Sequence, residues 1–89
     1  MNKQSESLLQ FPCEFMFKIF GQPSDEFEYE VLSIIRKYVK DLAEDAITCR
    51  PSKDGKYLAL TIKIRAENKT QLDNIYRELS ANPHVLMTL

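Results

Sequence analysis

Residues 57–66 read YLALTIKIRA and form the most regular pattern in the chain. Its members alternate between two sets, Leu58, Leu60, Ile62, Ile64 and Ala66 against Tyr57, Ala59, Thr61, Lys63 and Arg65. Successive side chains of a β-strand point to opposite faces, so the pattern predicts a strand with one core face and one solvent face. A shift of one residue would bury Lys63 and Arg65, and this cost fixes the register.

The residues just before this strand predict its hairpin partner. Residues 46–51, AITCRP, form a short alternating run, with Ile47 and Cys49 facing one side of the sheet. The proline at the end of the run favours an edge position. Residues 52–55, SKDG, then turn the chain, because Asp-Gly tolerates the positive φ angles of a tight hairpin.

A second long strand is predicted near the N-terminus. In residues 13–20 one face carries Cys13, Phe15, Phe17 and Ile19, and the other carries Glu14, Met16, Lys18 and Phe20. Two amphipathic helices follow the two long strands. The first begins with a capping box at Asp25 and Glu28 and carries the apolar stripe Phe27, Val31, Ile34, Ile35, Tyr38 and Leu42. The second begins with Asn68 and Gln71, carries Leu72, Ile75, Tyr76 and Leu79, and ends at Asn82-Pro83 before a short strand, Val85–Leu89.

The predicted order of elements is βαββαβ. Both helices must cover the same sheet face if one core is to form, which gives an α+β, ferredoxin-like sandwich. Right-handed crossovers then place the strands in the antiparallel order 4-1-3-2, with the two long strands in the middle. We expect one such domain over residues 11–89 and a flexible tail over residues 1–10.

Length and composition exclude several classes of protein. The 89 residues suffice for one domain, and 44% apolar with 28% charged residues is typical of a folded chain. The apolar runs are too short to cross a membrane, and residues 1–7 lack the apolar segment of a secretory signal. We therefore expect a cytoplasmic protein with no membrane contact and with reduced thiols.

Several short stretches resemble the YbeD family of small bacterial proteins. They are Arg50-Pro51-Ser52-Lys53, Gly55-Lys56-Tyr57, Gln71-Leu72-Asp73, Ile75 to Leu79 and Val85 to Leu89, with Phe11-Pro12 and Gly21. The resemblance covers residues 9–89. It implies a fold similar to the ACT regulatory domains of amino-acid metabolism, and a role in regulating lipoate metabolism that rests on gene neighbourhood. The family has no established catalytic or binding residues, so it implies no site.

The sequence offers no pattern typical of an enzyme. Cys13 and Cys49 are predicted to be inert buried thiols, because a strand separates them and no paired ligand spacing accompanies them. His84 lies at a strand entrance without a nucleophile to activate and is expected to be solvated. The absence of arginine between Ile19 and Ile35 excludes the phosphate loop of acylphosphatases, which share this fold. We expect no catalysis, no metal and no cofactor.

One candidate site is the loop that leads into the first helix. Gly21, Gln22 and Ser24 lie where free helix amides and the helix dipole can hold an anion. The resemblance adds that ACT domains bind effectors at the corresponding loop. The alternative is plain helix capping, which the negative charges of Asp25 and Glu26 favour.

The second candidate site is the sheet face away from the helices. Residues 25–45 contain seven acidic and three basic residues, whereas residues 46–66 contain five basic residues and one acidic. The candidate binding residues on this face are Lys18, Phe20, Arg50, Tyr57, Lys63 and Arg65, next to Met16. Cations beside exposed apolar groups are typical of a docking surface, and the alternative is simple solvation of an open sheet.

These features predict a non-catalytic regulatory or adaptor domain. Its partner would be another protein or a small metabolite, and a homodimer is a further alternative. The second hypothesis is an RNA-binding module, because RNA-recognition motifs share this topology and stack bases on central aromatic residues. A net charge of −1 and the presence of Ala59 on the central strand disfavour nucleic acid.

Overall fold

The computed structural model describes residues 10–89, so nearly all of the predicted flexible tail lies outside the described residues. The elements are β1 (Cys13–Gly21), α2 (Asp25–Tyr38), η1 (Glu44–Ala46), β2 (Ile47–Pro51), β3 (Leu58–Ala66), α3 (Lys69–Ala81) and β4 (Val85–Thr88). The predicted βαββαβ order is confirmed, with one short 3-10 turn, η1, added before β2.

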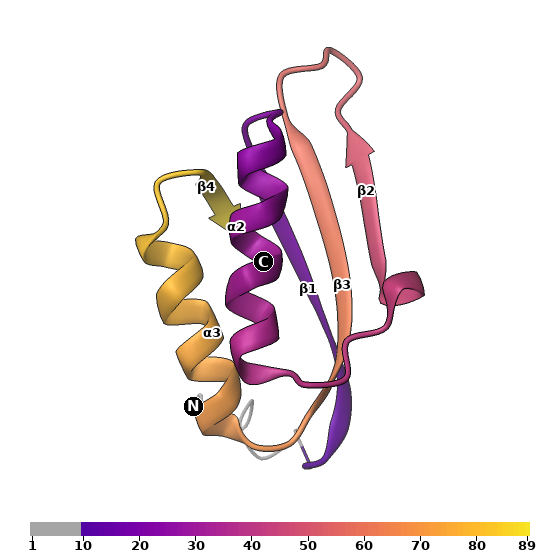
Figure 1. Ribbon diagram of the computed structural model, residues 1–89, viewed down its shortest axis with the longest axis vertical. Helices are drawn as coiled ribbons and strands as arrows, with labels where there is room; N and C mark the ends of the chain where they lie inside the picture. The colour runs from indigo at the N-terminus through magenta and orange to yellow at the C-terminus, as the bar shows by residue number, and fades with distance from the viewer. Residues whose placement is uncertain (1–9) are drawn as a thin grey trace, which may run out of the picture.

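The strands form one antiparallel sheet in the order β2-β3-β1-β4, which is the predicted order. Both helices lie on the same face of the sheet (Figure 1). The ferredoxin-like sandwich is therefore confirmed. The opposite face carries no element of the described chain and is called the open face below.

The pairing of β1 with β3 is the longest in the sheet and has the predicted register. Phe17 lies opposite Ile62 on the helix side, and Met16 lies opposite Lys63 on the open face. The core is built from Phe17, Ile19, Phe27, Val31, Ile34, Ile35, Val39, Leu60, Ile62, Ile64, Ala66, Leu72, Ile75 and Leu79. Every side chain in this list comes from β1, β3, the helices or the residue after α2, so the edge strands contribute little to the core.

The ends of α2 differ from those predicted. The cap is Ser24, whose backbone is extended and whose Oγ accepts a hydrogen bond from the amide of Phe27 at 3.1 Å. Asp25 is already the first helical residue, so the predicted capping box was wrong by one position. At the other end the helix stops at Tyr38, whose carbonyl oxygen accepts a hydrogen bond from Nε2 of Gln71 at 2.8 Å.

The start of α3 is as predicted, because Oδ1 of Asn68 accepts a hydrogen bond from the amide of Gln71 at 2.8 Å. Gln71 thus holds the N-terminus of its own helix and the C-terminus of α2. Leu42, predicted on the stripe of the first helix, instead lies half-buried in the following loop.

The prediction of two buried thiols was wrong for Cys49, which is exposed, and only partly right for Cys13, which is half-buried. Cys49 does face the helix side, opposite Leu60. However, β2 stands at the edge of the sheet, clear of both helices (Figure 1). A side chain of β2 that points to the helix side is therefore not buried, because no helix covers this strand. Partial desolvation, and then the nearby Glu28 carboxylate, raise the pKa of the Cys49 thiol.

The register predicts opposite outcomes for two adjacent substitutions. Ile62→Ala removes a fully buried side chain and should lower the free energy of unfolding by about 2–5 kcal/mol. Lys63→Ala removes an exposed side chain and should change it by no more than about 0.5 kcal/mol. Urea unfolding of both variants measures the difference. Similar midpoints would contradict the register.

Candidate functional site

The open face is ordered in rows that cross the strands. One row runs from Arg50 through Ala59 and Phe20 to Met87, each opposite the next. The next row runs through Thr48, Thr61, Lys18 and Leu89, since Lys18 and Leu89 exchange backbone hydrogen bonds of 3.3 and 2.8 Å. Lys63 with Met16, and Arg65 with Glu14, form two shorter rows on β3 and β1.

The six predicted binding residues share this face but do not meet at one point. Tyr57 and Arg65 lie eight positions apart, which is about 26 Å along an extended strand at ~3.3 Å per residue. Lys18 is central, with Nζ 6.0 Å from the centre of the Phe20 ring. Arg65 lies at the far end, where its Nε is 3.5 Å from Oε2 of Glu67. The cations therefore form a line rather than a cluster.

The open face divides into two halves of different chemistry. The cationic half, on β2 and β3, carries Arg50, Lys63 and Arg65. The apolar half, on β1 and β4, carries Met16, Phe20, Met87 and Leu89, with Lys18 between Met16 and Phe20 on β1. Within it Met16, Met87 and Leu89 are 54%, 51% and 62% exposed. Next to them Leu86, also exposed, is the extra residue where the register shifts between Phe20 and Gly21.

The β4 part of the apolar half was missed by sequence reasoning. Met87 and Leu89 lie on the last strand, which was predicted as a short strand with no binding residue on it. The signal was present, because the order 4-1-3-2 places this strand beside β1, and the alternation of Met87 with Thr88 then points Met87 to the open face.

The hairpin that presents Tyr57 is tightly hydrogen-bonded. Ser52 Oγ donates to Oδ1 of Asp54 at 2.8 Å and accepts from the amide of Tyr57 at 3.1 Å. Gly55 has the positive φ, 73°, that the turn requires. The Ser52 hydroxyl, and then the amide of Lys56, lower the pKa of Asp54. Tyr57, 46% exposed, therefore projects from a defined turn.

The predicted ligand loop is largely occupied by the protein itself. A Cβ built on Gly21 would lie 2.2 Å from the Phe27 ring and 2.6 Å from the carbonyl oxygen of His84. Gly21 is thus a close-packing position, and Ser24 is the helix cap. Gln22 is the exposed one of the three candidate residues, whereas Ser24 is half-buried and Gly21 is buried. The geometry favours capping and packing over effector binding. His84 is half-buried, and its amide donates to Oδ1 of Asn82 at 2.9 Å.

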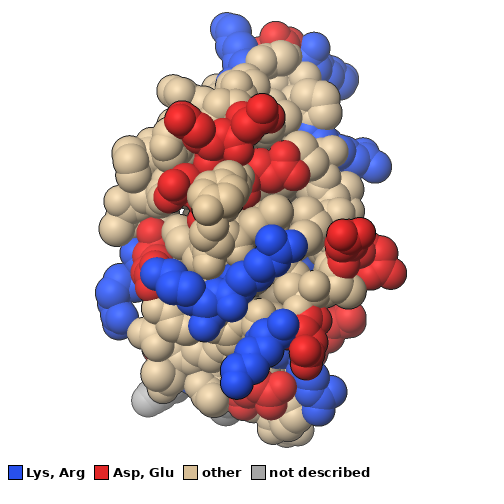
Figure 2. All heavy atoms as spheres, viewed as in Figure 1, with Lys and Arg blue, Asp and Glu red and all other residues tan. Residues whose placement is uncertain are grey.

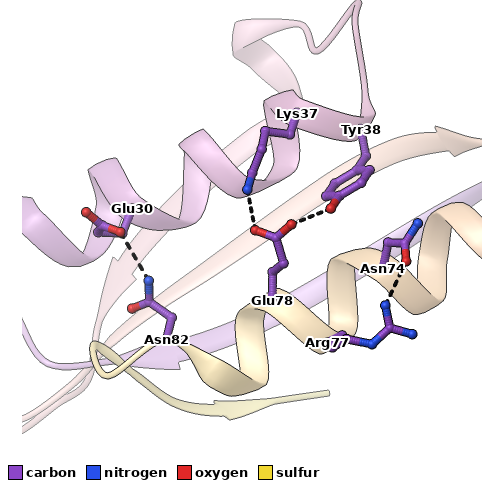
Figure 3. A network of polar contacts seen from close by, with 7 residues as sticks. All are labelled: Glu30, Lys37, Tyr38, Asn74, Arg77, Glu78 and Asn82. Atoms are coloured by element: carbon purple, nitrogen blue, oxygen red, sulfur yellow. Dashed lines mark hydrogen bonds and ion pairs between the residues drawn. The ribbon is translucent and has the colours of Figure 1, made fainter.

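A polar seam joins the two helices on the other side of the molecule (Figure 3). Glu78 of α3 accepts hydrogen bonds from Nζ of Lys37 at 2.5 Å and from the hydroxyl of Tyr38. These two bonds lower the pKa of Glu78, and the bond to Glu78 raises the pKa of Tyr38. Sequence reasoning did not find this seam, because its partners lie about forty positions apart.

Charge on the helix side is separated along α2 (Figure 2). Acids fill the first turn, at Asp25, Glu26 and Glu28, and bases fill the last, at Arg36 and Lys37. This arrangement opposes the helix dipole at both ends and stabilises the helix. The acids in the first turn of α2 therefore have a structural explanation in the helix dipole.

A groove of about 740 Å³ lies between the loop after α2 and the ends of β1 and β3. Its walls include Cys13, Leu42 and Ile64, together with charged residues of both signs. It adjoins the cationic half of the open face through Lys63 and Arg65. Among residues 10–89, no group of three or more His, Cys, Asp or Glu side chains is placed to hold a metal ion.

Comparison with known sequences places the chain among small bacterial proteins of similar length. A family model described as "Protein of unknown function (DUF493)" matches residues 6–89. The chain belongs to this family. Among the relatives, the UPF0250 protein of Chromobacterium violaceum is 39% identical over 89 residues and covers all of both chains. That of Nitrosomonas europaea is 42% identical over 84 residues, covering 94% of this chain and 97% of its own.

A solved structure supports the fold. The solution structure of protein HP0495 from H. pylori superposes with a TM-score of 0.75, covering 91% of this chain and 85% of that chain, at 16% identity. At this identity the likeness concerns the fold alone. In the described part of the chain, neither helix has the length and apolar character needed to cross a membrane.

The polar seam predicts a pH dependence of stability. Because the pKa of Glu78 is lowered in the folded state, its contribution is present above its ordinary value of about 4.5 and is lost as the pH falls through the folded value. Glu78→Gln should therefore be less stable than the parent at pH 7, and the difference should shrink at pH 3. Urea unfolding at both pH values measures this.

The control is Asn74→Ala, which removes the hydrogen bond of 2.9 Å that the Arg77 guanidinium donates to Oδ1 of Asn74 beside the seam, and neither of these groups titrates between pH 3 and pH 7. Its stability difference from the parent should be the same at both pH values. A difference for Glu78→Gln that stays constant with pH would show that Glu78 is not held as an anion by the seam.

Proposed function

We propose that the protein is a non-catalytic regulatory or adaptor domain that binds an acidic protein partner through the open face. The observation that carries the proposal is that three apolar side chains, each about half exposed, lie beside a line of cations. The apolar side chains are Met16, Met87 and Leu89, and the cations are Lys18, Arg50, Lys63 and Arg65. Contiguous apolar surface of this kind on a small domain marks a docking site more often than scattered single residues do. The cations would add selectivity for an acidic surface and speed its approach.

A small metabolite is the second candidate, and the groove beside Lys63 and Arg65 favours it. The resemblance to the YbeD family supports the further proposal that the regulated process is lipoate metabolism, as an ACT-like domain would do in amino-acid metabolism. Lipoate has an apolar chain and a carboxylate. Where the two halves of the open face meet, the apolar side chains could contact the chain and the cations could bind the carboxylate. We place the protein in the cytoplasm as part of the same proposal.

RNA binding receives less support from the geometry. Phe20 lies opposite Ala59, so the centre of the sheet offers one ring, and Tyr57 lies one row further along β3. The net charge of −1 also disfavours a polyanion. RNA binding is therefore the weaker hypothesis, and the capture experiment distinguishes it from binding to a protein.

The test uses a charge-reversed double variant, Lys63→Glu with Arg65→Glu. Both side chains are exposed, so the variant should fold normally. Affinity capture from native lysate should show a partner that binds the parent, binds the double variant roughly tenfold or more weakly, and weakens as salt is raised. The matched control is Arg36→Glu with Arg77→Glu, which reverses two exposed charges on the helix side, outside the lining of the groove, and should leave capture unchanged.

Equal capture by all three proteins would contradict the role of the open face. Titration with lipoate in place of lysate tests the metabolite alternative with the same variants. Capture of single-stranded RNA would instead support the second hypothesis, in which case Tyr57→Ala should cost about 1–3 kcal/mol of binding free energy through lost stacking.

A further inference from the structure

Among the described residues, the first half of β1 has no neighbouring strand on the β4 side. β1 pairs with β4 only between Lys18 and Gly21, and no strand of the described residues continues alongside residues 13–17 (Figure 1). Lys18 directs its backbone N–H and C=O toward β4, where both bond to Leu89. Every second residue of a strand points the same way, so the N–H and C=O of Met16 and Glu14 face this open edge.

An aromatic cluster lies beside the same edge on the helix side. The rings of Phe15 and Phe17 are 5.0 Å apart between centres, and the rings of Phe17 and Tyr76 are also 5.0 Å apart. Phe17 is fully buried, whereas Phe15 and Tyr76 are half-buried. Two of the three rings in the cluster therefore remain partly exposed.

We propose that two copies of this chain pair through this edge, β1 against β1, antiparallel about a two-fold axis at Phe15. Glu14 of each copy then lies opposite Met16 of the second copy. Each of these pairs can exchange both backbone hydrogen bonds, so the edge-facing N–H and C=O groups of Glu14 and Met16 find partners in both copies. The two four-stranded sheets become one continuous sheet with its helices on one side.

Charge and hydrogen bonding select this register over its neighbours. An axis at Glu14 would set the two Glu14 carboxylates opposite each other, which is unfavourable. An axis at Met16 would require Lys18, whose backbone groups are already bonded to Leu89. With the axis at Phe15, Glu14 of one copy lies opposite Met16 of the second copy. Within that second copy Met16 is paired with Lys63, so a positive charge lies one strand away from the Glu14 carboxylate.

The same register completes the aromatic cluster. Phe15 faces Phe15 of the second copy in the closely spaced type of pair, which buries more of both rings. Phe15 is the third residue of the nine in β1, so the overlap is short and the two molecules extend away from the axis in opposite directions. The other long edge suits pairing less well, because Pro51 on β2 has no N–H to offer.

This dimer is independent of the proposed function. It leaves the open face uncovered and places two such faces side by side. The test is sedimentation equilibrium of the full chain at increasing concentration, together with amide hydrogen exchange. The mass should rise from 10.4 kDa toward twice that value. The amides of Glu14 and Met16 should become protected over the same concentration range.

The decisive variant is Met16→Pro, which removes an N–H that faces the open edge and takes no part in the pairing of β1 with β3. It should weaken the dimer at least tenfold, whereas Met16→Ala, which keeps the N–H, should weaken it much less. A parent protein that stays at 10.4 kDa at every concentration would overturn the proposal, as would a dimer that Met16→Pro leaves unchanged.

A cross-linking variant covers the case in which Met16→Pro does not fold. Phe15→Cys in a Cys13→Ser, Cys49→Ser background places a single thiol on the axis, where directly opposite Cβ atoms are about 4.5–5.5 Å apart. Mild oxidation should then give a disulfide-linked dimer, and Tyr29→Cys in the same background, exposed on α2, should give far less. Equal yields from the two variants would contradict the proposed axis.

Discussion

The hydrogen-bonded pairing of β1 with β3 determines which side chains enter the core and which reach the open face. It joins the two nine-residue strands over their full length, with Phe17 opposite Ile62 and Met16 opposite Lys63. Because side chains alternate, this one register assigns the apolar set to the helices and the other set to the open face. A shift of one residue would turn Lys63 and Arg65 toward the helices and the apolar side chains of β3 toward solvent, so the helices would lose the apolar surface on which they pack.

The edge strands explain why the surface has its particular chemistry. β2 and β4 are five and four residues long and each flanks only part of a central strand. β2 brings Arg50 to the open face, and β4 brings Met87 and Leu89, so the two sides of that face differ. Among the described residues, no strand lies beside the first half of β1 on the β4 side, so the backbone groups of Glu14 and Met16 have no strand partner there. A single feature, short edge strands on long central ones, thus produces both the two-part open face and the unpaired half-edge.

The fold followed from the sequence because the alternation in β3 is long and unambiguous, and because the two helical stripes require a common sheet face. Cys49 shows where this reasoning fails: parity reports direction, whereas burial also needs a helix above the strand, and β2 has none. Ser24 was missed as a cap because Asp25, next to it, caps helices equally well. The Glu78 seam was missed because its partners meet only after both helices have packed. Of the candidate site, sequence predicted the cations and not the apolar part contributed by β4.

The most direct test of the register is the set of Hα–Hα nuclear Overhauser effects between β1 and β3. In an antiparallel pair these protons approach closely only between residues of non-hydrogen-bonded pairs. The structure predicts strong cross-peaks between Met16 and Lys63 and between Lys18 and Thr61. Cross-peaks that instead join Met16 to Ile64 or to Ile62 would show a shifted register and would contradict the assignment of both the core and the open face.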